Sequence, residues 1–360
     1  YRGFARAIAD QIQISLRPED ETRLGEATPV NPDVYEAYLR GMHILNNIRR
    51  LTDAEEAIAH FNRAVEQNPA DPLAYGGLAL CYATLGHSPD PPPNTWSLAR
   101  AAAERAIRLD STSAEGWAAL ADYKSYSERD WAGAERAFRR ANQLNPSLAM
   151  NHYHYAWFLA LFGRVEEAIA EHTRAAELDP LTPLHTVWIP ALHWFSGDYE
   201  RALEEALPLL ERYPENSIIW RVAARSAAYL GRIDEAIAYA EEASALRPGV
   251  ASRLAVYYWM AGRTAEALSL VREIETLPPS PYVALRLAGL HAALGDRDEA
   301  IRWLEYEPGH AFKGWIAWDP SFESLRDDPR FQAILRRMNQ ELVPGQIAPV
   351  PLPVVAPELP

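Results

Sequence analysis

The sequence predicts an all-α protein, a solenoid of about eight stacked helix pairs followed by a proline-rich extended tail. The first observation is a period of 34 residues, a spacing typical of stacked helical repeats. The second is that three residue types keep this period in one register. The residues that keep it are Pro146, Pro180, Pro214 and Pro248, Gly163, Gly197 and Gly231, and Ala168, Ala202 and Ala236. The third is an apolar spacing of i, i+3, i+4 and i+7 between these positions, which indicates helices.

Each residue type in the unit that ends at Pro180 has a mechanical role. Gly163 ends the first helix where the chain needs a left-handed turn, and Ala168 is small because two helices cross closely there. Pro180 ends the second helix and presets the start of the next one. Glu166 and Glu167 fall in the first turn of the second helix, where negative charge suits the helix dipole. Acidic pairs recur at this position in other units, which favours a structural role over catalysis.

The unit resembles the tetratricopeptide repeat, an antiparallel helix pair that stacks into a right-handed superhelix. Three copies are expected over 35–69, 74–110 and 116–146, and three more end at Pro180, Pro214 and Pro248. A seventh contains Gly262 and Ala267, and an eighth contains Gly295 and Ala300. The expected organisation is an N-terminal helix and linker (1–31), the solenoid (32–307), C-terminal capping helices (308–342) and the proline-rich tail (343–360).

The two ends of the chain resemble a group of bacterial multidomain signalling proteins. The segments FARAIADQIQISLRPEDETRL and WDPSFESLRDDPRFQAILRRM carry this resemblance. In such proteins a TolB-like segment precedes the repeats, and residues 1–17 match only its last helix. Because the signalling module is absent from this sequence, its activity is not carried over. The chain begins at Tyr1 rather than Met, so we expect either that a leader or upstream domain has been removed or that this is a fragment.

Composition argues against several classes of partner. The 49 acidic and 35 basic side chains give a net charge of −14, and no basic run appears, which disfavours nucleic acid. No run of about 18 apolar residues is present, so no membrane span is expected. The single cysteine, Cys81, is expected to be a buried apolar side chain. The compartment stays open, with an extracellular or periplasmic location favoured over a cytoplasmic one.

No catalytic, cofactor or metal site is predicted. His152 and His154 lie two residues apart on a helix and point about 200° apart, so they cannot chelate one ion. The chain contains no H-E-x-x-H motif, no nucleophile elbow and no phosphate-binding loop. Arg221 and Arg225, one turn apart, are the only local candidates, and they could grip a carboxylate. We therefore expect a non-enzyme.

The resemblance implies that the first helix of each pair lines a concave groove. In the register fixed by the prolines, this groove is aromatic and apolar with an arginine pair in the middle. The alternative for any single residue is a place in the core between helices. The predicted partner-binding residues are Tyr153, Trp157, Val187, Trp194, Phe195, Arg221, Arg225, Tyr229 and Trp259.

An aromatic groove suits a polyproline II ligand, which is extended before it binds. The tail offers such a segment, and the alternative is an untethered linker. The predicted donor residues are Pro349, Val350, Pro351, Leu352, Pro353, Val354 and Val355.

Two functions follow. One is a scaffold that self-assembles head to tail into a ring or filament, with other copies of this chain as partners. The other is a peptide- or ligand-sensing module of a bacterial signalling or transcriptional regulator whose effector domain is absent here.

Overall fold

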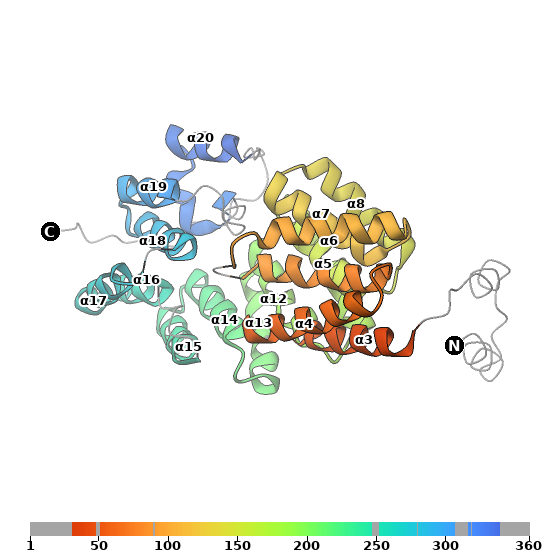
Figure 1. Ribbon diagram of the computed structural model, residues 1–360. Coiled ribbons are helices and arrows are strands. Elements are labelled where there is room, and N and C mark those ends of the chain that lie inside the picture. Colours follow the sequence, from red (N-terminus) through yellow and green to blue (C-terminus); the bar gives the residue numbers. More distant parts are fainter. Residues whose placement is uncertain are drawn as a thin grey trace.

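The computed structural model confirms an all-α architecture built from stacked antiparallel helix pairs (Figure 1). The structure describes residues 31–47, 51–88, 91–246, 252–278, 280–306, 316–317 and 319–338. The predicted N-terminal helix and the predicted donor tail lie outside these residues. In the described part of the chain, no helix is long and apolar enough to cross a membrane.

The first four pairs follow the predicted repeats, with a π-helix, η1 (Lys124–Glu128), inside the third. Their helices are α3 (Pro32–Asn46) with α4 (Leu51–Gln67), α5 (Pro72–Gly86) with α6 (Thr95–Leu109), α7 (Ala114–Tyr123) with α8 (Trp131–Leu144), and α9 (Ala149–Ala160) with α10 (Val165–Leu178).

The fifth pair has a divided first helix, and a short 3₁₀-helix, η4 (Pro320–Leu325), follows the eighth pair. The helices are α11 (Leu184–Val187) and α12 (Ile189–Phe195) with α13 (Tyr199–Arg212), α14 (Ser217–Tyr229) with α15 (Ile233–Leu246), α16 (Ser252–Met260) with α17 (Thr264–Glu275), α18 (Pro281–Leu294) with α19 (Arg297–Tyr306), and finally α20 (Pro329–Arg337).

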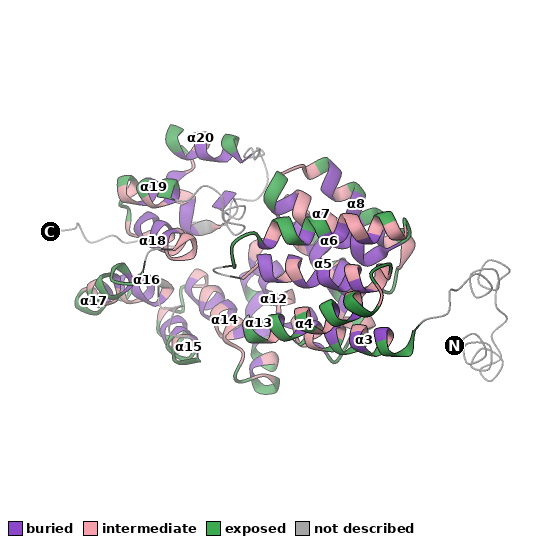
Figure 2. Cartoon of the chain, viewed as in Figure 1, coloured by how far each residue is buried: buried purple, intermediate pink, exposed green. Residues whose placement is uncertain are grey.

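The first helices of successive pairs contact each other directly, except between the fourth and fifth and between the sixth and seventh pairs, where such contacts are weak at most. Direct contacts join α3 to α5, α5 to α7, α7 to α9, α12 to α14, and α16 to α18, whereas second helices of successive pairs contact each other weakly at most. Because the array is closer packed on the first-helix side, that side is the concave one. Buried residues accordingly line the facing sides of the helices (Figure 2).

The structure confirms the roles predicted for the residues that repeat with the 34-residue period. Gly163, Gly197 and Gly231 adopt left-handed φ angles of 67°, 85° and 76° at the turns between helices. The alanines at the crossing position are fully buried, with 0% exposure for Ala168 and Ala202. The acidic pairs stand in the first turn of their helices, as at α10, α15 and α19. The 34-residue period therefore encodes both the turn and the helix crossing.

The first helix of the fifth repeat is divided because it contains a proline. Pro190 has no N–H to donate, and its ring would clash with the carbonyl of residue 186 in a continuous helix. The chain breaks at Trp188 and restarts as α12 with Pro190 in its first turn. This break was not predicted from the repeat pattern.

The third repeat departs from the pattern in another way. After α7 the helix widens into η1, and Arg129 at its end adopts a left-handed φ of 55°. The hydroxyl of Ser125 donates to the carbonyl of Ala121 at 2.9 Å, which satisfies one of the displaced backbone groups. Short π-helices are frequent at functional sites.

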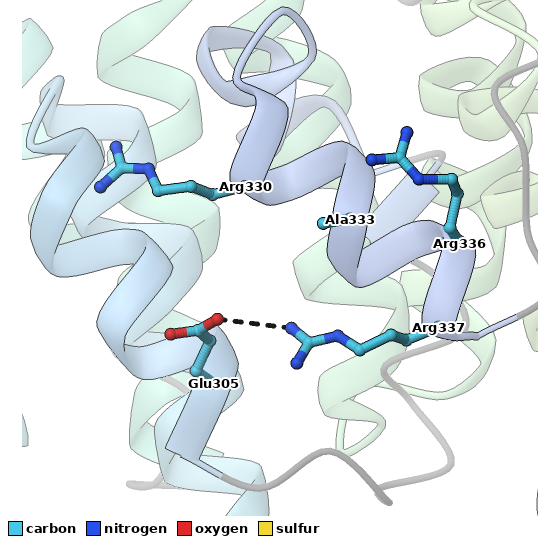
Figure 3. Close-up of a pocket in the computed structure, with 5 residues that line it drawn as sticks. All are labelled: Glu305, Arg330, Ala333, Arg336 and Arg337. Carbon is cyan, nitrogen blue, oxygen red and sulfur yellow. Dashed lines mark hydrogen bonds and ion pairs between the residues drawn. The ribbon is translucent and has the colours of Figure 1, made fainter.

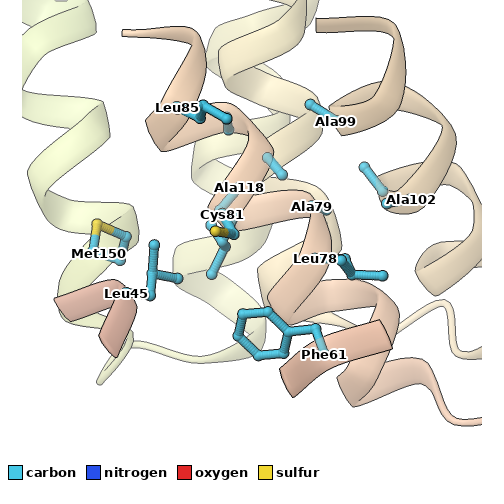
Figure 4. Close-up of a cluster of buried hydrophobic side chains, with 14 of the residues drawn as sticks. Leu45, Phe61, Leu78, Ala79, Cys81, Leu85, Ala99, Ala102, Ala118 and Met150 are labelled. Atoms are coloured by element: carbon cyan, nitrogen blue, oxygen red, sulfur yellow. The ribbon is translucent and has the colours of Figure 1, made fainter. Parts of the chain in front are cut away.

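The core of the first three repeats packs around Phe61 (Figure 4). A Cβ built on Gly77 would lie 2.2 Å from Cε1 of Phe61, and one on Gly41 would lie 2.7 Å away. The two glycines thus let α3, α4 and α5 approach one aromatic ring closely. Cys81 is fully buried beside them, as predicted, and burial raises the pKa of its thiol to about 12.

Candidate functional site

The predicted groove residues all lie on first helices, α9, α11, α12, α14 and α16, so the fold brings them to one side of the array. Their exposure differs. Val187, Trp194 and Trp259 are buried, with 1%, 1% and 2% exposure. The remaining predicted residues are half-buried: Tyr153, Trp157, Phe195, Arg221, Arg225 and Tyr229.

An aromatic cluster lies between the helices of the fourth and fifth repeats. Trp157 meets Trp188 edge to face, with ring centroids 4.9 Å apart, and also packs against His172 at 5.5 Å. Tyr153 packs against His172 and His185 at 5.2 and 5.6 Å. Burial lowers the pKa of His172 to about 3, so this imidazole is neutral at pH 7. The indoles of Trp157 and Trp188 are half-buried and stand nearly perpendicular to each other.

The sixth repeat places a cation against a second aromatic cluster, which contains Trp194, Tyr199 and Tyr229. The guanidinium of Arg225 lies 5.1 Å from the ring centroid of Trp194, a cation–π distance. Tyr229 stacks on Tyr199 with centroids 4.6 Å apart and meets Trp194 at 5.7 Å. Burial, followed by repulsion from Arg253, lowers the pKa of Arg225. A carboxylate close to these two arginines would relieve that repulsion.

The chain supplies such a carboxylate itself, from the segment Asp319–Leu325. Nη2 of Arg253 donates to both carboxylate oxygens of Asp319, at 2.8 and 3.0 Å. Burial alone would raise the pKa of Asp319, but the charges of Arg253 and Arg225 outweigh it and hold this pKa well below its usual range. Asp319 also caps η4 by accepting from the backbone N–H of Ser321 at 2.9 Å.

The rest of the segment packs on the eighth repeat. η4 contacts α18, and Phe322 and Leu325 are buried in one cluster with Ala288 and Ile301. Asp319–Leu325 therefore spans from the first helix of the eighth repeat to arginines on the first helices of the sixth and seventh. The concave side of the last three repeats is already lined by a segment of this chain.

Sequence reasoning did not single out Arg253 or Asp319. The Asp-Pro-Ser run at 319–321 is a helix start signal, with an N-cap and a proline at the first position. No local sequence signal identifies the partner of Asp319, because Arg253 lies 66 residues away. Only the curvature of the array brings the two together.

The histidines of α9 point in different directions, as predicted. His152 pairs with Glu171 and the carbonyl of Pro146, whereas His154 lies against Asp122 with Nδ1 to Oδ2 at 2.7 Å. His87 approaches the same oxygen at 3.4 Å. The prediction of no metal site rested on the spacing of ligands within single helices. His87, Asp122 and His154 belong to three different helix ends or helices, so that spacing does not test them as a group.

The surface depression shown in Figure 3 lies elsewhere, between α19 and α20. It is lined by Glu305, Arg330, Ala333, Arg336 and Arg337. Arg337 pairs with Glu305 at 3.3 Å, and Arg330 pairs with Asp328 and Asp298 at 2.8 Å each. These paired charges join the last two helices and offer no group suited to catalysis.

Comparison with known proteins gives one family match. The family model described as "Tetratricopeptide repeat" matches residues 49–90, 125–183, 192–251 and 221–282, more than half of the chain.

One curated relative and two solved structures are similar to this chain over shorter or more divergent stretches. The transcriptional regulator HilA of Salmonella typhimurium is 27% identical over 172 residues, which cover 47% of this chain and 31% of HilA. The chain thus spans about a third of the length of that relative. A monomeric mutant of IFIT1 with Gppp-AAAA aligns with a TM-score of 0.53 at 16% identity, over 85% of this chain and 75% of IFIT1. The APC/C hetero-tetramer Cut9–Hcn1 aligns with a TM-score of 0.52 at 16% identity, over 85% of this chain and 54% of the matched chain. At this identity the two structures are alike in fold alone.

Proposed function

Because the chain belongs to the tetratricopeptide repeat family, we propose that it is a non-catalytic protein-interaction module whose concave side binds extended peptide segments. The observation that supports this is the position of Asp319–Leu325 against Arg253 and α18. The chain's own segment occupies the place that a peptide ligand would take, with a carboxylate between two arginines and an aromatic side chain, Phe322, in an apolar cluster.

The part of the concave side suited to a second peptide is the aromatic cluster of the fourth and fifth repeats. Trp157 and Trp188 are half-buried and meet edge to face, an arrangement that accepts the ring of a proline from the ligand. Arg221 and Arg225 follow on the next first helix, one turn apart. The proposed ligand is therefore an extended, proline-containing segment with a carboxylate toward the sixth repeat.

We further propose that this ligand is the proline-rich tail of a neighbouring copy. The tail carries apolar side chains between its prolines and one carboxylate, Glu358, two residues before the end of the given sequence. Docking on a neighbour is a heterologous contact, which gives a ring if it closes and a filament if it does not. The tail lies outside the described residues, so self-assembly stands as a prediction.

A second candidate function is supported by the similarity to HilA, a transcriptional regulator. In that case this chain is the recognition module of a bacterial regulator, and its concave side binds a segment of another protein. The two candidates share the same binding surface and differ in the ligand.

Light scattering after gel filtration tests the self-assembly directly. We compare the full chain with a deletion of 343–360 and with a length-matched variant that changes Val350, Leu352, Val354 and Val355 to Ser. Self-assembly predicts large species for the full chain and monomers for both variants, with unchanged helical circular dichroism. A concentration-independent monomer of the full chain would exclude self-assembly and leave the recognition module.

The binding surface is tested separately with Trp157→Ala and Trp188→Ala. If the concave side binds the tail, a synthetic peptide of residues 343–360 should bind the tail-deleted chain, and each substitution should weaken it by about 5- to 30-fold, the usual effect of losing one aromatic anchor. Leu181→Ala, at a side chain 88% exposed between repeats, is the control and should leave binding unchanged. Equal affinity for all four proteins would place the ligand elsewhere.

A further inference from the structure

Three titratable side chains from successive first helices meet inside the array. His87 caps the end of α5, Asp122 lies near the end of α7, and His154 lies in the middle of α9. Oδ2 of Asp122 is 3.4 Å from Nε2 of His87 and 2.7 Å from Nδ1 of His154. The three ligand atoms all lie within 4.8 Å of one another.

This cluster is buried, and besides the two ion pairs several of its polar atoms have no hydrogen bond of normal geometry. The side chains of Asp122 and His154 are 0% and 2% exposed, and that of His87 is 23% exposed. Within the described residues, neither carboxylate oxygen of Asp122 makes a hydrogen bond of normal geometry, nor do Nε2 of His87 and Nε2 of His154. Oδ1 of Asp122 and Nε2 of His154 are buried without a hydrogen bond, which is costly, so a further partner is expected at this point.

The surroundings of the cluster depart from the regular repeat. His87 precedes the insertion SPDPPPN that separates α5 from α6, and Asn94 at its end adopts a left-handed φ of 64°. Asp122 lies two residues before the start of the π-helix η1. Tyr126 of η1 packs on the His87 ring at 4.5 Å, and Trp96 packs on it from the other end of the insertion at 5.4 Å. Both irregular segments of the N-terminal half therefore contribute to one site.

We propose that His87, Asp122 and His154 bind one zinc ion. Two imidazole nitrogens and one carboxylate oxygen are a usual ligand set for zinc, with a fourth position left for water. A tetrahedral ion with bonds of about 2.1 Å separates its ligand atoms by about 3.4 Å. The His87–Asp122 separation has this value, and the other separations, at 2.7 Å and within 4.8 Å, bracket it.

The charges and the access route suit a divalent cation. Two neutral imidazoles and one carboxylate leave the occupied site with a net charge of +1. His87 is the partly exposed member of the cluster, with 23% of its side chain exposed, so the cluster is not sealed from solvent on that side. The bound ion joins the first helices of the second, third and fourth repeats, and its role in this chain is to fix their mutual arrangement.

The test uses the full chain with any polyhistidine tag removed and with bound metal stripped by a chelator. After equilibrium dialysis against zinc chloride, elemental analysis should find one zinc per chain. Cobalt(II), used as a probe, should give the visible absorption of a tetrahedral site. Zinc at a hundredfold excess over its Kd should raise the Tm by about 5 °C.

Asp122→Asn and His87→Ala should each weaken zinc binding by more than about 100-fold and abolish the Tm shift, because each removes a direct ligand. His152→Gln is the matched control on α9, since this histidine pairs with Glu171 instead, and should bind zinc as the native chain does. His87→Ala decides the outcome if the buried substitution fails to fold. Fewer than about 0.2 zinc per chain, or equal zinc affinity in His87→Ala and the native chain, would overturn the proposal.

Discussion

The ion pair between Arg253 and Asp319 allows a quantitative test of how the C-terminal segment is held. The informative substitution is Asp319→Asn, because asparagine keeps the oxygen that caps η4 and removes only the charge. Arg253→Met removes the cation with little change in volume. Both substitutions leave the apolar contacts of Phe322 and Leu325 in place.

The expected loss in the free energy of unfolding follows from how far the pair is exposed and from its hydrogen-bond geometry. The side chains of Arg253 and Asp319 are 19% and 22% exposed, and one nitrogen contacts both oxygens. Exposed pairs contribute about 0–1 kcal/mol, whereas removing one partner of a fully buried pair costs about 3–5 kcal/mol. With about four-fifths of each side chain covered, each single substitution should lower the free energy of unfolding by about 2–3 kcal/mol.

Urea unfolding followed by circular dichroism measures this effect. The double variant should cost less than the sum of the single ones, because the second substitution no longer strands a charge. Glu36→Gln is the control, since its pair with Arg40 is 61% exposed on both sides, and it should change stability by less than about 0.5 kcal/mol. Strict additivity, or single costs as small as that of the control, would refute a coupled pair.

The same pair makes stability depend on pH. Because the pKa of Asp319 is depressed in the folded state, the stabilisation that its carboxylate contributes is present above about pH 4 and is lost as the pH falls below that. The Asp319→Asn variant should lack this acid-dependent loss of stability.

Two further predictions concern the core. Gly77→Ala should destabilise the chain by about 2 kcal/mol despite the better helix propensity of alanine, because its Cβ would lie 2.2 Å from Phe61. Gly289→Ala is the control: its Cβ would lie 3.6 Å from Phe322, so it should stabilise the chain by about 0.5–1 kcal/mol. Equal urea midpoints for the two variants would contradict the close approach of Gly77 to Phe61. His172 has its pKa lowered to about 3 by burial, so its neutral form supports the fold above about pH 6.5 and this contribution falls as the pH drops from about 6.5 toward 3. His172→Gln should flatten the pH dependence of the Tm over that window, and an unchanged slope would show that the folded state protonates this ring without cost.

The repeat could be predicted from the sequence because its determinants are local. A glycine in a left-handed turn and an alanine at a helix crossing act within one helix pair, and each recurs with the period. The break at Trp188 was also encoded locally, by Pro190, but the regular spacing on either side concealed it.

The ion pair and the His87–Asp122–His154 cluster could not be predicted in this way. Their members lie on different first helices and meet because of how the pairs stack, which no spacing within a helix reveals. The predicted groove residues lie on first helices, but the sequence could not separate Trp194, which is buried, from Trp157, which is half-buried. A shift of about one helical turn moves a side chain from the core to the concave side, and only the packing of neighbouring helices determines which place a given aromatic residue takes.

The segment Asp319–Leu325 also limits how this chain can vary through evolution. Repeat arrays usually gain and lose units one at a time, because each unit depends only on its neighbours. Here a segment beyond the eighth repeat is tied to the seventh by Arg253 and rests on α18. Deleting or duplicating one of the last repeats would move Asp319 out of reach of its arginines. The C-terminal end should therefore be inherited as one block.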